Sequence, residues 1–196
     1  MRRDASAPIR RATAALIALF LLSLVASAGA SAQTGGSAAP GAPAGSGPPV
    51  SAPVGGKPGK AKLIRRSGMA IAPPNAPAAV VNAIAAGNAI HKRPYVWGGG
   101  HASFDSWGYD CSGAVSYVLH AAGLLSSPLP SGPLMSWGLP GKGRWIRVMA
   151  NPSHAYAVIA GLRFDTSSYG SGGSGPRWRP TKRGAGGFAV RHPAGL

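Results

Sequence analysis

The chain has 196 residues, with 20 Lys and Arg against 4 Asp and Glu, which gives a formal net charge of +16. That length allows one ordinary domain with extra segments, and 30 glycines and 19 prolines indicate that part of the chain is low in complexity. A charge so positive favours polyanionic partners, either nucleic acid or an anionic cell envelope, and the single cysteine excludes an internal disulfide.

Residues 1–32 have the pattern of a secretory signal peptide. Arginines at positions 2, 3, 10 and 11 precede an apolar run from Ala14 to Val25, and Ala30-Ser31-Ala32 matches a signal cleavage site. The run is short for a transmembrane helix, so we expect no stable membrane insertion after cleavage; an uncleaved anchor is the alternative. The mature protein would be secreted or cell-wall associated. It would then meet anionic cell-envelope polymers, and we expect no nucleic-acid partner.

Residues 33–74 are rich in Gly, Pro, Ala and Ser, with a few basic residues between them. Too little apolar surface is present there to offset the entropy of ordering, so we expect a disordered linker. Its cations either hold the protein near anionic polymers or are simply solvated. One domain should then cover residues 75–196.

A helix from about Ala76 to Ile90 should open the domain, with Asn75 as its N-cap. Its inner face should carry Val80, Val81 and Ile84. An aromatic and glycine-rich loop, Pro94 to Gly100, follows. Beyond it, His101 and Asp105 are two candidate metal ligands without a partner set, so we predict no metal site.

The only cysteine, Cys111, precedes a second helix. Apolar residues recur at helical spacing at Val115, Val118 and Leu119, and Gly123 is a plausible stop. The N-terminus of a helix stabilises an anion, and a thiol placed there loses its proton more easily to give the nucleophilic thiolate. The alternative is that Cys111 is a small buried apolar residue, as most single cysteines are.

Two strands should follow downstream, the first beginning at His154 and the second, Leu162 to Thr166, after a tight turn at Gly161. The second strand carries Asp165, one of the four acidic residues. A cysteine on a helix, a histidine at a strand start and a carboxylate on the next strand suit a nucleophile, a base and an orienting group. Taken alone, His154 would more often be a structural or surface histidine.

The remaining segments complete the predicted architecture. Trp145 to Val148 should form a strand, Gly187 to His192 a final edge strand, and Trp137 lies in a long Pro- and Gly-rich connection. This tryptophan either stacks on a sugar ring or anchors the loop. Helices followed by a small antiparallel sheet predict an α+β fold.

Three motifs resemble the NlpC/P60 family of papain-like cysteine peptidases, which cut the peptide stems of bacterial cell wall: Pro94-Tyr95-Val96-Trp97-Gly98-Gly99, Asp110-Cys111-Ser112-Gly113, and His154 ahead of an apolar strand. The resemblance covers about residues 76–196. It implies a papain-like fold and a secreted thiol protease that hydrolyses the γ-D-glutamyl–diamino-acid bond of peptidoglycan. We expect a monomer without a cofactor. The sequence lacks the Gly-Asp-Leu-Val-Phe-Phe-like segment that members usually carry before the histidine.

The proposed mechanism assigns a role to each site residue. Cys111 would attack an amide carbonyl after giving its proton to His154, and Asp165 would fix the imidazole tautomer. The Cys111 backbone N–H would help to stabilise the oxyanion. The resemblance implies that Tyr95 supports the site or the oxyanion, and that Asp110 and Ser112 contact the substrate.

Several alternatives remain open. The third catalytic position is often His, Asn or Gln in the family, and Thr166 and Ser167 are rivals of Asp165. The chain could also be a catalytically silent wall-binding module, or a secreted structural or adhesive basic protein. Neither of these functions would depend on the Cys111 thiol.

Overall fold

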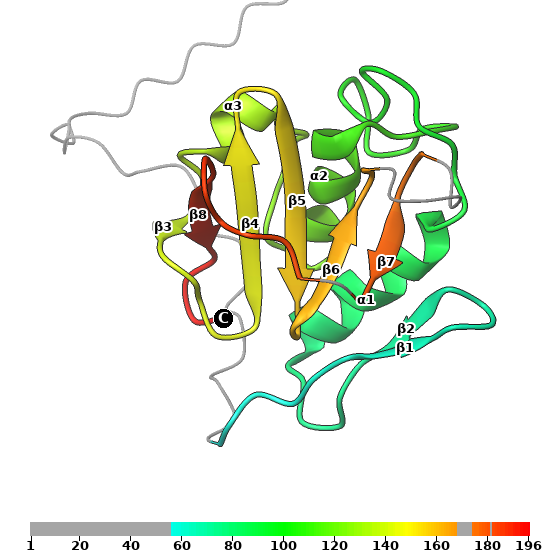
Figure 1. Cartoon of the computed structure of the whole chain (residues 1–196). Helices are drawn as coiled ribbons and strands as arrows, with labels where there is room; N and C mark the ends of the chain where they lie inside the picture. The colour runs from blue at the N-terminus through cyan, green and yellow to red at the C-terminus, as the bar shows by residue number, and fades with distance from the viewer. Residues whose placement is uncertain (1–55, 168–173, 181) are drawn as a thin grey trace, which may run out of the picture. The chain divides into compact units, whose positions relative to one another are not determined.

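The computed structural model describes residues 56–167, 174–180 and 182–196 (Figure 1). The predicted signal peptide and the predicted linker as far as residue 55 lie outside the described residues. Among the described residues, every helix is too short or too polar to pass through a membrane.

The described part begins with a β-hairpin where the sequence predicted a disordered linker. Strand β1 (Lys62–Ile64) pairs antiparallel with β2 (Met69–Ile71), and Leu63 lies opposite Ala70. Ala70 is buried in the core, and the Asn88 side chain bonds its backbone N–H at 2.8 Å and its carbonyl at 2.9 Å. The linker prediction is therefore wrong for residues 62–71, because a tertiary contact orders a segment whose composition favours disorder.

Helix α1 (Ala78–Ile90) follows Pro77 and has no side-chain N-cap. The prediction that Asn75 caps it is wrong, since the Asn75 side chain donates to the carbonyl of Lys57 instead. Val80 and Ile84 are buried as expected, but Val81 is 42% exposed. The buried stripe runs through positions 80, 83, 84 and 87 at helical spacing, and this spacing turns position 81 away from the core.

Six strands form one sheet in the order β3-β8-β4-β5-β6-β7, and each recorded pairing is antiparallel. Their bounds are β3 (Leu139–Pro140), β4 (Ile146–Asn151), β5 (His154–Ile159), β6 (Leu162–Asp165), β7 (Arg177–Arg179) and β8 (Ala189–His192). The predicted final edge strand, β8, instead lies inside the sheet, where it pairs with β4 and with the short β3. The α+β prediction is confirmed.

Two helices cover one face of this sheet: α1 and α2 (Cys111–Ala121) (Figure 1). Ala155, Ala157 and Ile159 of β5 are fully buried on that side. The small alanines let α2 approach β5 closely. Because strand side chains alternate, Tyr156 and Val158 point to the opposite face, whereas His154 lies at the end of the strand. The sheet thus has a helix-covered face and an outer face.

The long connection before β4 contains a short helix, α3 (Ser131–Leu134), and Trp137. The Trp137 side chain is partly buried against the core, and its carbonyl accepts a hydrogen bond from Arg191 Nε at 2.8 Å. This packing favours the loop-anchor interpretation of Trp137 over a sugar-stacking role.

Asn88→Ala should destabilise the domain, because this side chain joins three elements. Besides Ala70 of β2, its Oδ1 accepts from Trp178 Nε1 of β7 at 2.9 Å. Unpaired polar groups in a partly buried site should lower the free energy of unfolding by about 1–3 kcal/mol in urea titrations. Asn82→Ala, an exposed change on the same helix, is the control and should cost nothing. Equal stability of the two variants would contradict the role of Asn88.

Candidate active site

Cys111 is the first residue of helix α2 and is 8% exposed. Asp110 is the N-cap, and its Oδ1 accepts a hydrogen bond from the Gly113 N–H at 2.8 Å. Gly123, with φ +73°, follows the C-cap Ala122 as predicted. The thiol therefore lies beside backbone N–H groups that have no acceptor within the helix, at the positive end of the helix dipole.

The start of α2 packs directly against the glycine-rich loop. A Cβ on Gly113 would overlap the carbonyl oxygen of Gly99, and one on Gly100 would lie 2.9 Å from the Gly113 Cα. The loop also pairs with the residues before the helix, through Tyr109 N–H to Pro94 O (3.0 Å) and Asp110 N–H to Gly99 O (3.1 Å). Only glycines at these positions allow the backbone approach that brings the Tyr95 segment beside Cys111.

Tyr95 is half-buried and lies within electrostatic reach of the thiol. Burial raises the pKa of its phenol, and the negative charges of Cys111 and Asp110 raise it further. The hydroxyl therefore keeps its proton at neutral pH. A protonated phenol at this place can donate a hydrogen bond to a developing oxyanion.

His154 stands at the start of β5, as the sequence predicted. Its backbone N–H donates to Asn151 Oδ1 at 2.8 Å, which fixes the turn between β4 and β5. On the ring, Nε2 lies 3.0 Å from Asp165 Oδ1 and 3.1 Å from Ser167 Oγ. The second ring nitrogen, Nδ1, is therefore the one that can form the hydrogen bond with the Cys111 thiol.

The protonation of His154 depends on both of its predicted partners. Burial alone lowers the pKa of this imidazole, but hydrogen bonds with Asp165 and Cys111, and the charges of both, raise it to about 9. The imidazole is thus mostly protonated at neutral pH. The site thus holds an imidazolium beside the Cys111 side chain, and an imidazolium is the charge state of the histidine in the ion pair that cysteine nucleophiles use.

Asp165 is 2% exposed, and every oxygen of its carboxylate has a partner. Oδ1 also accepts from the Ser167 N–H at 3.0 Å, and Oδ2 lies 3.4 Å from Nη1 of both Arg163 and Arg183. Burial raises the pKa of this carboxyl, but the hydrogen bonds from His154 and Ser167 and the His154 charge hold it well below its usual range. Asp165 is thus an ionised group that can orient an imidazolium.

Sequence reasoning missed the two arginines beside Asp165. Arg163 was detectable, because it stands two residues before Asp165 in one strand and must point to the same face. Arg183 comes from an irregular segment, where no periodicity predicts its direction. Ser167, a rival for the third position, lies beside the imidazole together with Asp165, and its Oγ accepts from Arg183 Nη1 at 2.9 Å.

Asp110 and Ser112 are 4% and 2% exposed, and their polar atoms are engaged within the protein. His101 Nε2 lies 2.9 Å from Asp110 Oδ2 and 2.9 Å from Ser112 Oγ. Asp110 Oδ2 also accepts from the Gly98 N–H at 3.2 Å. This network favours a positioning role for Asp110 and Ser112, and their contact with substrate stays a prediction. His101, considered before only as a metal ligand, ties the loop to the helix start.

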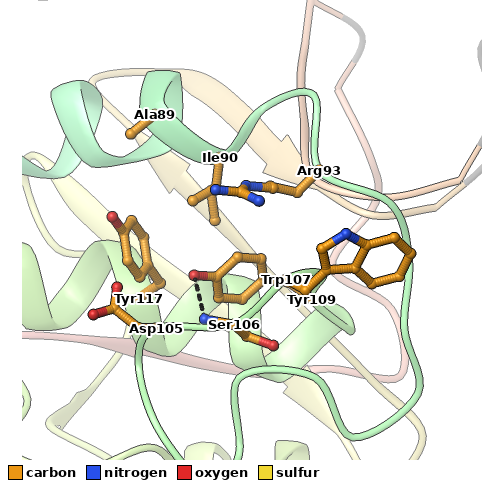
Figure 2. A pocket seen from close by; sticks show the side chains of 8 residues that line it. All are labelled: Ala89, Ile90, Arg93, Asp105, Ser106, Trp107, Tyr109 and Tyr117. Carbon is orange, nitrogen blue, oxygen red and sulfur yellow. Dashed lines mark hydrogen bonds between the residues drawn. The ribbon is translucent and has the colours of Figure 1, made fainter.

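A separate open cavity of about 530 Å³ lies between the end of α1 and the loop before Asp110 (Figure 2). Figure 2 shows Arg93, Trp107 and Tyr117 around it, and Tyr109 at its base accepts from the Ser106 N–H at 3.3 Å. Trp107 is 72% exposed. None of the predicted catalytic side chains lines this cavity.

Gly113→Ala should lower the free energy of unfolding by about 1–3 kcal/mol, because the added methyl group forces the Gly99 carbonyl away. Alanine has a higher helix propensity than glycine and would by itself stabilise α2, so a loss of stability would have to come from the contact with Gly99. Gly132→Ala in α3 is the matched control, since a Cβ there meets nothing within 4 Å. Urea unfolding of both variants checks the contact, and equal stability would mean that the loop yields without cost.

The His154 imidazole should titrate near pH 9 in NMR spectra of the folded protein, against about 6.5 when unfolded. Its protonation therefore stabilises the fold fully below about pH 6.5, and this contribution is lost as the pH rises through about 9. Asp165→Asn should lower the His154 pKa, because burial then acts against a weaker partner. Asp105→Asn, which removes an exposed carboxylate, should leave the titration unchanged. An equal titration in wild type and Asp165→Asn would exclude the pairing.

No protein-family profile and no curated protein sequence matches the chain. Solved structures of two Mycobacterium tuberculosis proteins are similar to part of it. Rv1477, described as a hypothetical invasion protein, is 26% identical with a TM-score of 0.42, over 58% of this chain and 61% of its own. The peptidoglycan hydrolase RipB (Rv1478) is 24% identical with a TM-score of 0.44, over 58% of this chain and 64% of its own. The chain thus spans less than two thirds of the length of either protein.

Proposed function

We propose that the chain is a secreted cysteine peptidase of the NlpC/P60 type that hydrolyses an amide bond in the stem peptides of peptidoglycan. One observation carries this proposal: Cys111 at a helix start, His154 at a strand start and the buried Asp165 converge with their polar atoms in contact. A histidine that only packs in the core would need neither a hydrogen bond with an ionised carboxylate nor a hydrogen bond with a thiol.

In the first half-reaction, the Cys111 thiolate attacks the carbonyl carbon of the scissile amide, and the carbonyl oxygen becomes an oxyanion. The Cys111 N–H and the Tyr95 hydroxyl are the donors that stabilise this charge. The carbon–nitrogen bond then breaks, and the His154 imidazolium gives its proton to the leaving amine. A thioester on Cys111 remains.

In the second half-reaction, the now neutral His154 takes a proton from water, and the resulting hydroxide attacks the thioester. The carbon–sulfur bond breaks, the product leaves as a carboxylic acid, and the sulfur leaves as a thiolate beside the imidazolium. Asp165 holds the imidazole in one orientation through both steps and stabilises its charged form. Water is the only co-reactant, and no cofactor is needed.

The substrate and the location belong to the same proposal. The resemblance of the motifs around Tyr95, Cys111 and His154 to NlpC/P60 peptidases supports a D-glutamyl–diamino-acid bond as the target. The signal-like pattern of residues 1–32 supports export to the compartment that holds this substrate. Without residues 1–32, which carry four arginines and Asp4, the net charge falls from +16 to +13, and this charge supports retention at an anionic cell envelope.

The test is digestion of purified peptidoglycan by the full chain without its signal segment, followed by mass spectrometry of the muropeptides. Wild type should release one new amine and one new carboxyl terminus for each bond cut. Cys111→Ala should release none, because no nucleophile remains. His154→Ala should lose at least about 100-fold in rate, since a general base commonly contributes that much. His192→Ala, a histidine in the same sheet, is the control and should stay active.

Three results would contradict the proposal in different ways. Cleavage by Cys111→Ala would exclude the thiol as nucleophile. Binding to the wall without cleavage by wild type would identify a silent binding module. Neither binding nor cleavage would favour a structural or adhesive protein. As a measurement that needs no substrate, iodoacetamide should label Cys111 faster in wild type than in His154→Ala.

A further inference from the structure

A cavity of about 340 Å³ opens on the outer face of the sheet, over β4 to β7. Six of its nine lining residues are cations, and none is acidic. Its three neutral lining residues are Val158, Gly161 and Pro180. We call this cavity the basic cavity. Its six cationic lining residues are Lys60, Arg147, Arg163, Arg179, Lys182 and Arg183.

The strand register gathers three of these arginines into one row. Arg147 of β4 lies opposite Val158 of β5, which lies opposite Arg163 of β6, which in turn lies opposite Arg179 of β7. Residues directly opposite one another in antiparallel strands have their Cβ atoms about 5 Å apart and point to the same face. The fold therefore places Arg163 and Arg179 side by side and Arg147 across one valine from them.

Such a row is costly unless an anion compensates it, because like charges directly opposite one another destabilise a sheet. The protein offers little compensation, since it has four acidic residues. Of these, Asp165 contacts Arg163 and Arg183, Asp110 pairs with His101, and Asp105 lines the other cavity. Of the three aspartates that the structure describes, Asp165 is therefore the one that contacts these cations, and it contacts two of the six.

Two of these arginines, Arg163 and Arg179, are held in place by contacts within the protein. Arg163 is 4% exposed, although it also pairs with Asp165. Arg179 Nη2 donates to the carbonyl of Ser167 at 2.7 Å, which fixes the guanidinium plane. Its Nε is buried and makes no hydrogen bond to any residue that the structure describes. A fixed guanidinium with a donor to spare suits a tetrahedral oxyanion, which accepts several hydrogen bonds at once.

We propose that the basic cavity binds a phosphate group, carried either by free phosphate or by a phosphodiester. A carboxylate brings one charge and two acceptor oxygens in one plane. Inorganic phosphate near neutral pH brings up to two charges and four tetrahedral oxygens, and a phosphodiester brings one charge and four tetrahedral oxygens, two of them non-bridging. The cavity is also roomy enough to hold an organic group attached to the phosphate. The basic cavity is distinct from the thiol, but it is contiguous with Asp165 through Arg163 and Arg183.

Calorimetric titration of the full chain with inorganic phosphate, in chloride buffer of constant ionic strength, tests the site. Binding should be saturable with one site per chain. Arg147→Gln and Lys60→Gln should each weaken it about 10-fold, because each removes one charged hydrogen-bond donor. Arg66→Gln and Lys142→Gln remove the same charges from exposed positions outside the cavity, and they should leave the affinity within about 2-fold of wild type.

A second arm with glycerophosphoglycerol distinguishes the two sources of the phosphate. Diester binding equal to or tighter than inorganic phosphate would point to a phosphodiester ligand, and binding of the dianion alone to a free phosphate. Phosphate should also raise the melting temperature of wild type more than that of Arg147→Gln. No saturable binding of either ligand, or an equal loss in Arg66→Gln and Arg147→Gln, would overturn the proposal. Thermal melts without ligand verify that each variant is folded.

Discussion

The positions of His154 and of the nearby arginines depend on one constraint, the buried negative charge of Asp165. At 2% exposure this carboxylate has lost its water, so the protein must compensate its charge. His154 does so on one side, and Arg163 and Arg183 do so on the other. The direction of the imidazole and the arrangement of the nearby cations are therefore coupled. A change on either side would leave a buried charge short of partners.

A second constraint acts on the backbone around the thiol. The helix start is held by the Asp110 cap, by the His101 bridge and by the close contact of Gly113 with Gly99. These contacts involve no part of the sheet. The thiol and the imidazole are thus positioned by two separate frameworks, which meet where α2 packs on β5. Ala155 and Ala157 of β5 are fully buried in the core that forms there.

The parts of the site that were predictable from sequence depend on local patterns. Helical spacing after Cys111 and strand alternation after His154 determine which element each residue begins, and the short distance along the chain to Asp165 fits one hairpin. The hairpin around Ala70 was not predictable, because its order comes from Asn88, far away in the sequence. The internal place of β8 and the role of Arg183 were likewise missed, since strand order and loop direction depend on contacts that no local pattern contains.

The division of the site between two frameworks has a consequence for incompletely folded chains. His154 and Asp165 belong to adjacent strands joined by a tight turn, so the proposed base and its proposed orienting group can assemble within one hairpin, at a small cost in loop-closure entropy. The sulfur arrives only when a helix from an earlier part of the chain docks on that hairpin. A chain without this docking keeps the Cys111 thiol apart from His154. Under the mechanism that we propose, chemical competence is therefore a property of the completed tertiary structure, and a misfolded copy would lack it.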